Sequence, residues 1–190
     1  KDTLILTDPV MGDDGAVYPI YTEELRSRFC ELTRRSYVIT PNLTEALLLL
    51  YGKEKMEEIW NKLQKVSEAR RMEEIREIGC GLARKFSLSA VVITGVDHRE
   101  EGQPLKMGNL VLENGNSSWV FAEKSGGSYS GTGDLFASVL SAGLVKRYSM
   151  KTCAELAVDF ISASIRDAVE EGTDRNDGVC FEQHLGMLLP

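Results

Sequence analysis

The sequence feature that most limits the possible folds is an alternation of short apolar runs and helical segments. Residues 3–7 (TLILT), 37–39 (YVI) and 90–93 (AVVI) are rich in β-branched and aliphatic side chains, and each run is closed by polar residues, proline or glycine. Such runs are typical of the buried strands of parallel sheets. The stretches between them carry apolar residues at helical spacing, as Leu25 and Phe29 do. This order predicts an α/β fold with a mostly parallel central sheet and helices on both faces.

One β-hairpin is expected in addition. Residues 106–112 and 118–122 flank the sequence Asn114-Gly115-Asn116, and Asn-Gly between two apolar runs is a strong hairpin signal. No internal repeat and no linker-like segment divides the chain. We therefore expect residues 1–190 to form a single domain, and 190 residues of which 43% are hydrophobic suffice for one core.

The expected helices have recognisable starts and breaks. Thr22 is placed to cap a first helix. Residues 53–84 are expected to form two helices with a break near residues 66–69, and their charges indicate a solvated face. Two more helices are expected at about residues 135–146 and 151–169, followed by a loop (172–178) and an amphipathic segment (181–188).

Composition and charge argue against several classes of protein. The net charge is -7 and no block of Lys or Arg stands out, so we expect no nucleic-acid partner. The longest apolar runs, such as residues 46–50, are too short to span a membrane, and the first residues lack a signal-peptide pattern. The four cysteines are far apart with no C-x-x-C pair, which favours reduced thiols in a cytoplasmic protein over a disulfide framework or a metal cluster.

The strongest chemical signal is the transition from a polar, glycine-rich loop (123–130) to a helix at Gly131-Thr132-Gly133-Asp134. The glycines let another molecule approach bare amide groups, and the unpaired N–H groups and dipole of a helix N-terminus favour an anion, above all phosphate. A carboxylate beside a phosphate repels it unless the carboxylate handles a proton or a metal. The alternative is that Thr132 or Asp134 merely caps the helix.

Other polar residues also fall at strand ends or helix starts. Asp8 follows the first strand, Asn42 and Glu45 follow the second strand and open a helix, and Thr94 follows the third. In a doubly wound sheet these positions gather along one edge with the Gly131 turn, where ligands bind. The coincidence favours a functional site over an isolated helix cap.

Four motifs now resemble a known family. Residues 8–13 (DPVMGD), 40–45 (TPNLTE), 92–95 (VITG) and 131–134 (GTGD) occur in the order found in ribokinase-like small-molecule kinases. More narrowly, the chain resembles the pyridoxal (vitamin B6) kinases. The resemblance covers nearly all of the chain, and it implies phosphorylation of the 5'-hydroxymethyl group of pyridoxal, pyridoxine or pyridoxamine by ATP.

The resemblance also implies roles for particular residues. Asp134 is expected to be the general base and to border the B6 substrate, and the amides of Gly131, Thr132 and Gly133 to form the anion hole. Tyr18 is expected to border the substrate. The remaining positions are expected to hold ATP, its phosphates and Mg²⁺: Asp8, Asn42, Glu45, Thr94 and Gly95 on the nucleotide, and Asp8, Asp13, Thr40 and Glu45 on the metal. Hard oxygen ligands of this kind suit Mg²⁺, and phosphoryl transfer depends mainly on positioning and charge neutralisation.

The sequence departs from the resembled family in two respects. Gly95 stands where this branch often has serine, which puts one phosphate contact in doubt. The family fold also begins upstream of the DPVMGD motif, so the chain is expected to be the C-terminal two-thirds of the kinase domain, without its first strands and part of the substrate pocket, and Lys1 not to be the natural start. The resemblance further implies a homodimer and a monovalent cation.

Two alternatives stay open. A kinase for hydroxymethylpyrimidine, a thiamin precursor, shares the Asp-Pro-Val-Met and Thr-Pro-Asn-x-x-Glu signatures, although that branch usually has cysteine at the position of Asp134. The other alternative is a non-catalytic module that binds a nucleotide or a partner protein. The carboxylate of Asp134 argues against it, because a simple binder gains nothing from a negative charge aimed at phosphate.

Overall fold

The computed structural model describes residues 3–189, and Lys1 lies outside them. A central sheet has the strand order β1-β4-β5-β6-β7. Strands β1, β4 and β5 pair in parallel, whereas β6 is antiparallel to both of its neighbours, so β6 alone runs against the other strands of this sheet. The bounds of the sheet strands are Leu6–Thr7 (β1), Val38–Ile39 (β4), Ala90–His98 (β5), Lys106–Glu113 (β6) and Asn116–Glu123 (β7). The mostly parallel α/β fold predicted from the sequence is confirmed.

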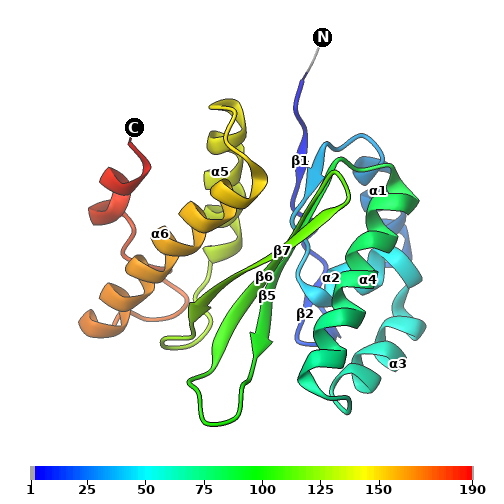
Figure 1. The fold of residues 1–190 in the computed structure, drawn as a ribbon, viewed down its shortest axis with the longest axis horizontal. Coiled ribbons are helices and arrows are strands. Elements are labelled where there is room, and N and C mark those ends of the chain that lie inside the picture. Colours follow the sequence, from blue (N-terminus) through cyan, green and yellow to red (C-terminus); the bar gives the residue numbers. More distant parts are fainter. Residues whose placement is uncertain (1–2, 190) are drawn as a thin grey trace.

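Helices cover both faces of the sheet (Figure 1). Helices α1 to α4 lie on one face, and α5, α6 and the C-terminal turn η1 lie on the other. The bounds are Glu23–Thr33 (α1), Leu43–Tyr51 (α2), Lys53–Leu63 (α3), Glu68–Phe86 (α4), Thr132–Val145 (α5), Met150–Glu171 (α6) and Glu182–Leu188 (η1, a 3₁₀ helix).

The two faces bury separate apolar clusters. Successive side chains of a strand point to opposite faces, and β5 shows this directly. Val91 and Ile93 pack into the cluster under α1 to α4, whereas Ala90 and Val92 pack into the cluster under α5 and α6. This burial on both faces is the reason why the run at residues 90–93 is continuously apolar rather than alternating.

The predicted hairpin is confirmed. Strands β6 and β7 pair from Lys106 with Glu123 to Glu113 with Asn116, which leaves Asn114 and Gly115 as a two-residue turn. Both turn residues have positive φ, 49° and 84°, as a tight turn matched to the strand twist requires.

Strand β5 differs from its prediction, which ended it at Thr94 and Gly95. The strand continues to His98, with a register shift between Ile93 and Val96. Gly95 has φ +69°, so the chain forms a bulge there and then resumes its pairing with β6. The Thr-Gly sequence therefore marks a bulge and not a strand end.

Helix boundaries agree closely with the sequence prediction. Thr22 caps α1 by accepting a hydrogen bond from the backbone N–H of Leu25. The break between α3 and α4 falls slightly earlier than predicted, at residues 64–67, because Ser67 caps α4. Helix α5 begins at Thr132, which places Asp134 inside its first turn.

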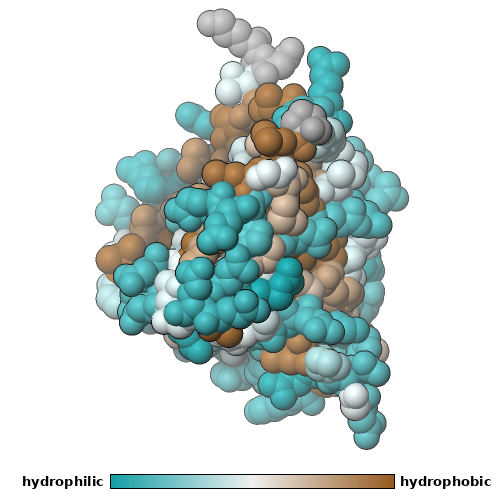
Figure 2. Space-filling model, turned by 90° about the vertical axis from the view of Figure 1, so that its left-hand side faces the viewer, coloured by the Kyte–Doolittle hydropathy of each residue, from teal (hydrophilic) through white to brown (hydrophobic). Residues whose placement is uncertain are grey.

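A small second sheet lies beside the start of α2. It pairs β2 (Gly12–Asp13) with β3 (Ala16–Val17) in an antiparallel hairpin. Among residues 3–189, none of the helices combines the length and the apolar composition that a membrane span requires. The outer face formed by α5, α6 and the C-terminal turn is mostly hydrophilic, with hydrophobic residues gathered towards the end that carries the N-terminus (Figure 2).

Candidate active site

One cavity of about 820 Å³ lies along the edge of the sheet where β1, β4 and β5 lead into their loops. Its volume is typical of a pocket for a small molecule. Every site residue predicted from the sequence lines this cavity: Asp8, Asp13, Tyr18, Thr40, Asn42, Glu45, Thr94, Gly95, Gly131, Thr132, Gly133 and Asp134. The expectation that strand ends and helix starts gather at one edge is confirmed, while the roles of these residues stay predictions.

The N-terminus of α5 forms one wall of the cavity. Gly131 is the N-cap residue, with φ +81°, and no side chain caps the helix. The hydroxyl of Thr132 donates to the backbone carbonyl of Tyr129 at 3.1 Å instead. The amides of the first turn therefore keep no side-chain acceptor among the described residues and are available to an anion. Neither Thr132 nor Asp134 caps α5 with its side chain, so the alternative of a simple helix cap is not supported.

Asp134 is exposed in the cavity, and its carboxylate makes no hydrogen bond to any described residue. Asp8 faces it from the end of β1, and a Cβ placed on Gly133 would lie 3.7 Å from Oδ2 of Asp8. Burial raises the pKa of Asp8, and the nearby negative charge of Asp134 raises it further. The hydrogen bond from the Thr40 hydroxyl (2.7 Å) lowers the pKa of Asp8 and partly offsets the rise. Two carboxylates at one helix N-terminus favour a cation or a proton between them.

Asn42 and Glu45 form a capping box at the start of α2. Oδ1 of Asn42 accepts from the backbone N–H of Glu45, and Oε2 of Glu45 accepts from the backbone N–H of Asn42, each at 3.0 Å. Oε1 of Glu45 also accepts from the N–H of Met11 at 3.0 Å. Burial raises the pKa of Glu45 to about 8, although these N–H donors act in the opposite direction.

The same helix start holds the β2–β3 hairpin over the cavity. The side-chain amide of Asn42 donates to the carbonyl of Gly12 at 2.8 Å, and the N–H of Gly15 donates to the hydroxyl of Thr44, also at 2.8 Å. Asp13 and Tyr18 reach the cavity from this hairpin and its exit. Burial is the first cause that raises the pKa of each, and for Tyr18 the carboxylate of Asp13 is the second.

Thr94 and Gly95 lie at the bulge of β5 and line the cavity. The N–H of Thr94 donates to the carbonyl of Pro41 at 2.9 Å, and the N–H of Gly95 donates to the side chain of Asn109 at 3.3 Å. A Cβ on Gly95 would meet nothing within 4 Å. The glycine is therefore needed for its backbone angle and not for lack of space.

The donor set fits Mg²⁺ held largely through water and a ligand's phosphates. Asp8, Asp13 and Glu45 supply carboxylate oxygens and Thr40 a hydroxyl, which are the hard donors that Mg²⁺ prefers. Within residues 3–189, no three His, Cys, Asp or Glu side chains are grouped closely enough to hold a metal by themselves. Mg²⁺ commonly keeps several waters and binds through one or two carboxylates and substrate phosphates.

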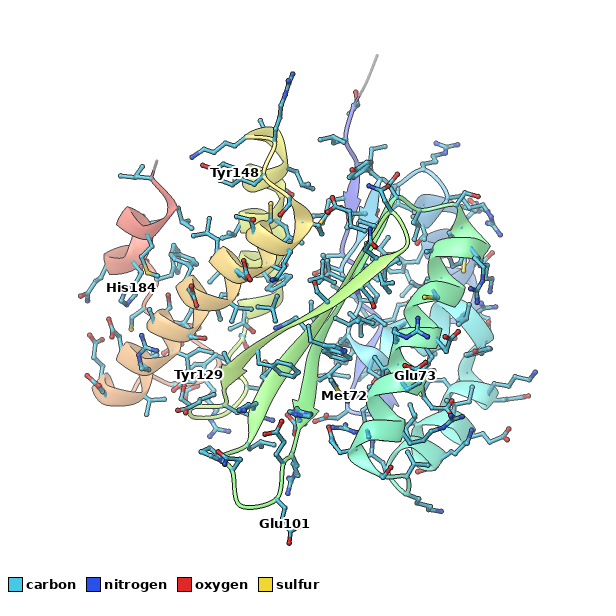
Figure 3. The ribbon with its side chains drawn as sticks, in the orientation of Figure 1. Met72, Glu73, Glu101, Tyr129, Tyr148 and His184 are labelled. Carbon is cyan, nitrogen blue, oxygen red and sulfur yellow. The ribbon has the colours of Figure 1, made fainter. Side chains whose placement is uncertain are left out.

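The cavity also contains residues that the sequence did not single out. They include Asp97, Asn109, Lys124, Ser128, Tyr129, Arg175 and Asn176. Lys124 forms an ion pair with Asp97 at 2.7 Å. Tyr129 is buried beside α6, in a small apolar cluster with Ala168 and Val179 (Figure 3). Lys124, Ser128 and Tyr129 could have been suspected from their place in the glycine-rich loop. The other four had no sequence signal, because Asp97 and Asn109 lie within β5 and β6, and Arg175 and Asn176 follow α6, far along the chain.

Comparison with known proteins gives one family. A family model described as phosphomethylpyrimidine kinase matches residues 1–178. No curated protein matches the chain.

Solved structures match over almost the whole chain. A provisionally assigned phosphomethylpyrimidine kinase from Bacteroides thetaiotaomicron, crystallised with pyridoxal, is 30% identical with a TM-score of 0.82, and the match covers 100% of this chain and 62% of that one. Pyridoxal kinase from Lactobacillus plantarum is 26% identical with a TM-score of 0.77, covering 98% and 61%.

Pyridoxal kinase from Leishmania donovani, in complex with ADP and pyridoxamine, is 22% identical with a TM-score of 0.71 and shares the fold, covering 99% of this chain and 59% of that one. The ribokinase-like fold implied by the four motifs is confirmed. The chain spans about 60% of the length of the structures that it matches.

Proposed function

The chain belongs to the phosphomethylpyrimidine kinase family, and we propose that the protein transfers the γ-phosphoryl group of ATP to the 5'-hydroxymethyl group of pyridoxal, pyridoxine or pyridoxamine. The observation that carries this proposal is the uncapped N-terminus of α5, where free amides and the unpaired carboxylate of Asp134 share one cavity. Free amides suit a phosphoryl group in transfer. An unpaired carboxylate beside them suits a base that activates the attacking hydroxyl.

The reaction is an in-line displacement. The substrate hydroxyl oxygen attacks the γ-phosphorus, its proton passes to the carboxylate of Asp134, and the bond from the γ-phosphorus to the bridging oxygen breaks to release ADP. The amides of Gly131, Thr132 and Gly133 stabilise the charge on the transferred group. Tyr18 borders the B6 substrate in this proposal, and Thr94 and Gly95 lie beside the nucleotide phosphates.

Mg²⁺ bound to ATP would neutralise phosphate charge in the cavity. Asp8, Asp13, Thr40 and Glu45 are proposed to hold it, directly or through water, because they supply hard oxygen atoms to the cavity that the N-termini of α5 and α2 also line. The solved relatives whose descriptions name ADP or AMP-PNP support ATP as the co-substrate. A monovalent cation and a homodimer stay predictions.

A second candidate substrate is hydroxymethylpyrimidine, which is favoured by the description of the family model and of one solved relative. Both substrates are aromatic rings with a hydroxymethyl group, and the α5 N-terminus would serve either. The position of Asp134, where the pyrimidine kinases usually have cysteine, favours the B6 vitamers.

The test is a turnover assay on the complete protein with Mg²⁺ and ATP and each acceptor in turn. The proposal expects ADP release that depends on pyridoxal, pyridoxine or pyridoxamine, with a kcat/KM well above that for hydroxymethylpyrimidine. A preference for hydroxymethylpyrimidine would select the second candidate. Nucleotide binding without turnover of any acceptor would overturn the kinase proposal and leave a binding module.

A further inference from the structure

Arg175 is an arginine in the cavity wall whose guanidinium forms no ion pair or hydrogen bond with a described residue. The other cation in the wall, Lys124, is already paired with Asp97. Arg175 lies on the loop after α6, and its backbone carbonyl accepts from the N–H of Ser130 at 2.9 Å. The loop is thereby fastened to the residue that precedes the α5 anion site.

The guanidinium of Arg175 lies flat on the backbone of Gly127. A Cβ built on Gly127 would collide with the guanidinium carbon and with both terminal nitrogens at nearly equal distances. Gly127 therefore faces the flat side of the guanidinium and not its edge. Only glycine leaves room for this contact. One face of the guanidinium is covered by peptide, and Arg175 and Gly127 both line the cavity.

The glycine-rich loop that supports the Arg175 guanidinium packs against α6. A Cβ on Gly126 would lie 2.7 Å from a methyl of Val169 and 3.7 Å from one of Ile165. Tyr129 anchors the same loop in a small apolar cluster. Ile165, on α6, lines the cavity as well, so this end of the cavity joins a flat cation to aliphatic side chains.

The opposite end of the cavity has a different chemistry. The β2–β3 hairpin lies on the face of the sheet covered by α2, whereas α6 and its following loop lie on the other face (Figure 1). The hairpin end carries Asp13 and Asp14, which suit a cation, and the α5 N-terminus lines the same cavity. A flat cation backed by glycine with aliphatic neighbours suits a planar aromatic ring.

We propose that Arg175, held by Gly127, is the residue that stacks on the base of the nucleotide. The inference rests on the proposed kinase function, because it takes the phosphates to lie at the α5 N-terminus. A guanidinium stacks well on aromatic faces because it is planar and weakly hydrated. Its pre-positioning on Gly127 reduces the entropy lost when the base binds.

The test measures binding of Mg·ATP and of magnesium tripolyphosphate, which has the phosphates without the base, by calorimetry on the complete protein. Arg175→Ala should weaken Mg·ATP binding by roughly three- to thirtyfold and leave tripolyphosphate unchanged. Arg175→Lys keeps the charge without the plane and should resemble Arg175→Ala. Arg99→Ala, which removes an exposed arginine outside the cavity, is the matched control and should change neither ligand.

Gly127→Ala gives an independent check. Its methyl group would displace the guanidinium, so it should weaken Mg·ATP binding in the parent and have no further effect in the Arg175→Ala background. Equal weakening of Mg·ATP and tripolyphosphate by Arg175→Ala would overturn base stacking in favour of a phosphate contact. Unchanged Mg·ATP binding in Arg175→Ala would overturn any nucleotide role for the residue. A parent protein that bound neither ligand would instead overturn the proposed function.

Discussion

Asn42 and Glu45 form a reciprocal capping box at the N-terminus of α2, in which each side chain accepts a hydrogen bond from the backbone N–H of the other residue at 3.0 Å. The pair also holds the β2–β3 hairpin, through the carbonyl of Gly12 and the N–H of Met11. Two residues that the family resemblance assigns to the nucleotide, one of them also to Mg²⁺, are therefore structural as well. Their replacement should change folding stability and metal use together.

Glu45→Gln is expected to lower the free energy of unfolding by about 1–3 kcal/mol, because the amide nitrogen of glutamine cannot accept one of the two N–H donors that Glu45 satisfies. Urea unfolding of the parent and the variant measures this. Glu58→Gln, at an exposed position of α3, is the control and should stay within about 0.5 kcal/mol of the parent. Equal stability of Glu45→Gln and the parent would show that these hydrogen bonds contribute nothing.

The pH dependence of that stability has a defined sign. Burial raises the pKa of Glu45 from 4.5 to about 8 in the folded protein. Between these values the folded state binds more protons than the unfolded state, so the contribution of Glu45 to stability falls as pH rises from about 4.5 to 8 and is level above that. In EDTA without nucleotide, the stability difference between the parent and Glu45→Gln should shrink over this range. A constant difference would contradict the raised pKa.

Glu45→Gln should also raise the Mg²⁺ concentration needed for half-maximal turnover, because a carboxylate that helps to hold the cation is lost. A titration of kcat against free Mg²⁺ at saturating ATP tests this separately from stability. If the titration curve of the variant overlays that of the parent, Glu45 acts only as a cap and hairpin tether.

Asp134→Asn separates catalysis from folding. Since no side chain caps α5, the substitution should leave the melting temperature nearly unchanged. Asparagine cannot take the hydroxyl proton, so kcat should fall by roughly 10²- to 10⁴-fold. ATP affinity should hold or increase, because a negative charge near the phosphates is removed. A variant that melts normally and turns over within a few-fold of the parent would refute the base assignment.

The contact between α5 and α6 can be tested by substitution at Gly143. Both helices cover the face of the sheet opposite α1 to α4 (Figure 1). A Cβ on Gly143 would lie 2.5 Å from Sγ and 3.3 Å from Cβ of Cys153, which is fully buried. Gly143→Ala should therefore destabilise the protein by about 1–3 kcal/mol through overpacking. Adding Cys153→Ala removes the sulfur and should recover part of the loss, and strict additivity of the two changes in thermal melts would contradict direct contact.

Much of the fold was predictable because its signals are local. The apolar runs at residues 37–39 and 90–93 sit where β4 and β5 form, and the Asn114-Gly115 turn joins β6 to β7. The position of Asp8 at the end of β1 was also readable, since the hydrophobic run stops there. β5 was misjudged at Gly95 because a bulge and a strand end have the same local sequence.

Contacts between distant segments were decided only by the tertiary structure. Met11 and Glu45 are 34 residues apart, and only the folded chain makes the carboxylate of Glu45 an acceptor for the N–H of Met11 and buries it enough to raise its pKa. Arg175 carried no sequence signal, and the folded chain alone brings its guanidinium onto Gly127. Sequence periodicity reports which face of an element is buried, but burial energies, pKa values and stacking depend on which partner the packing brings to that face.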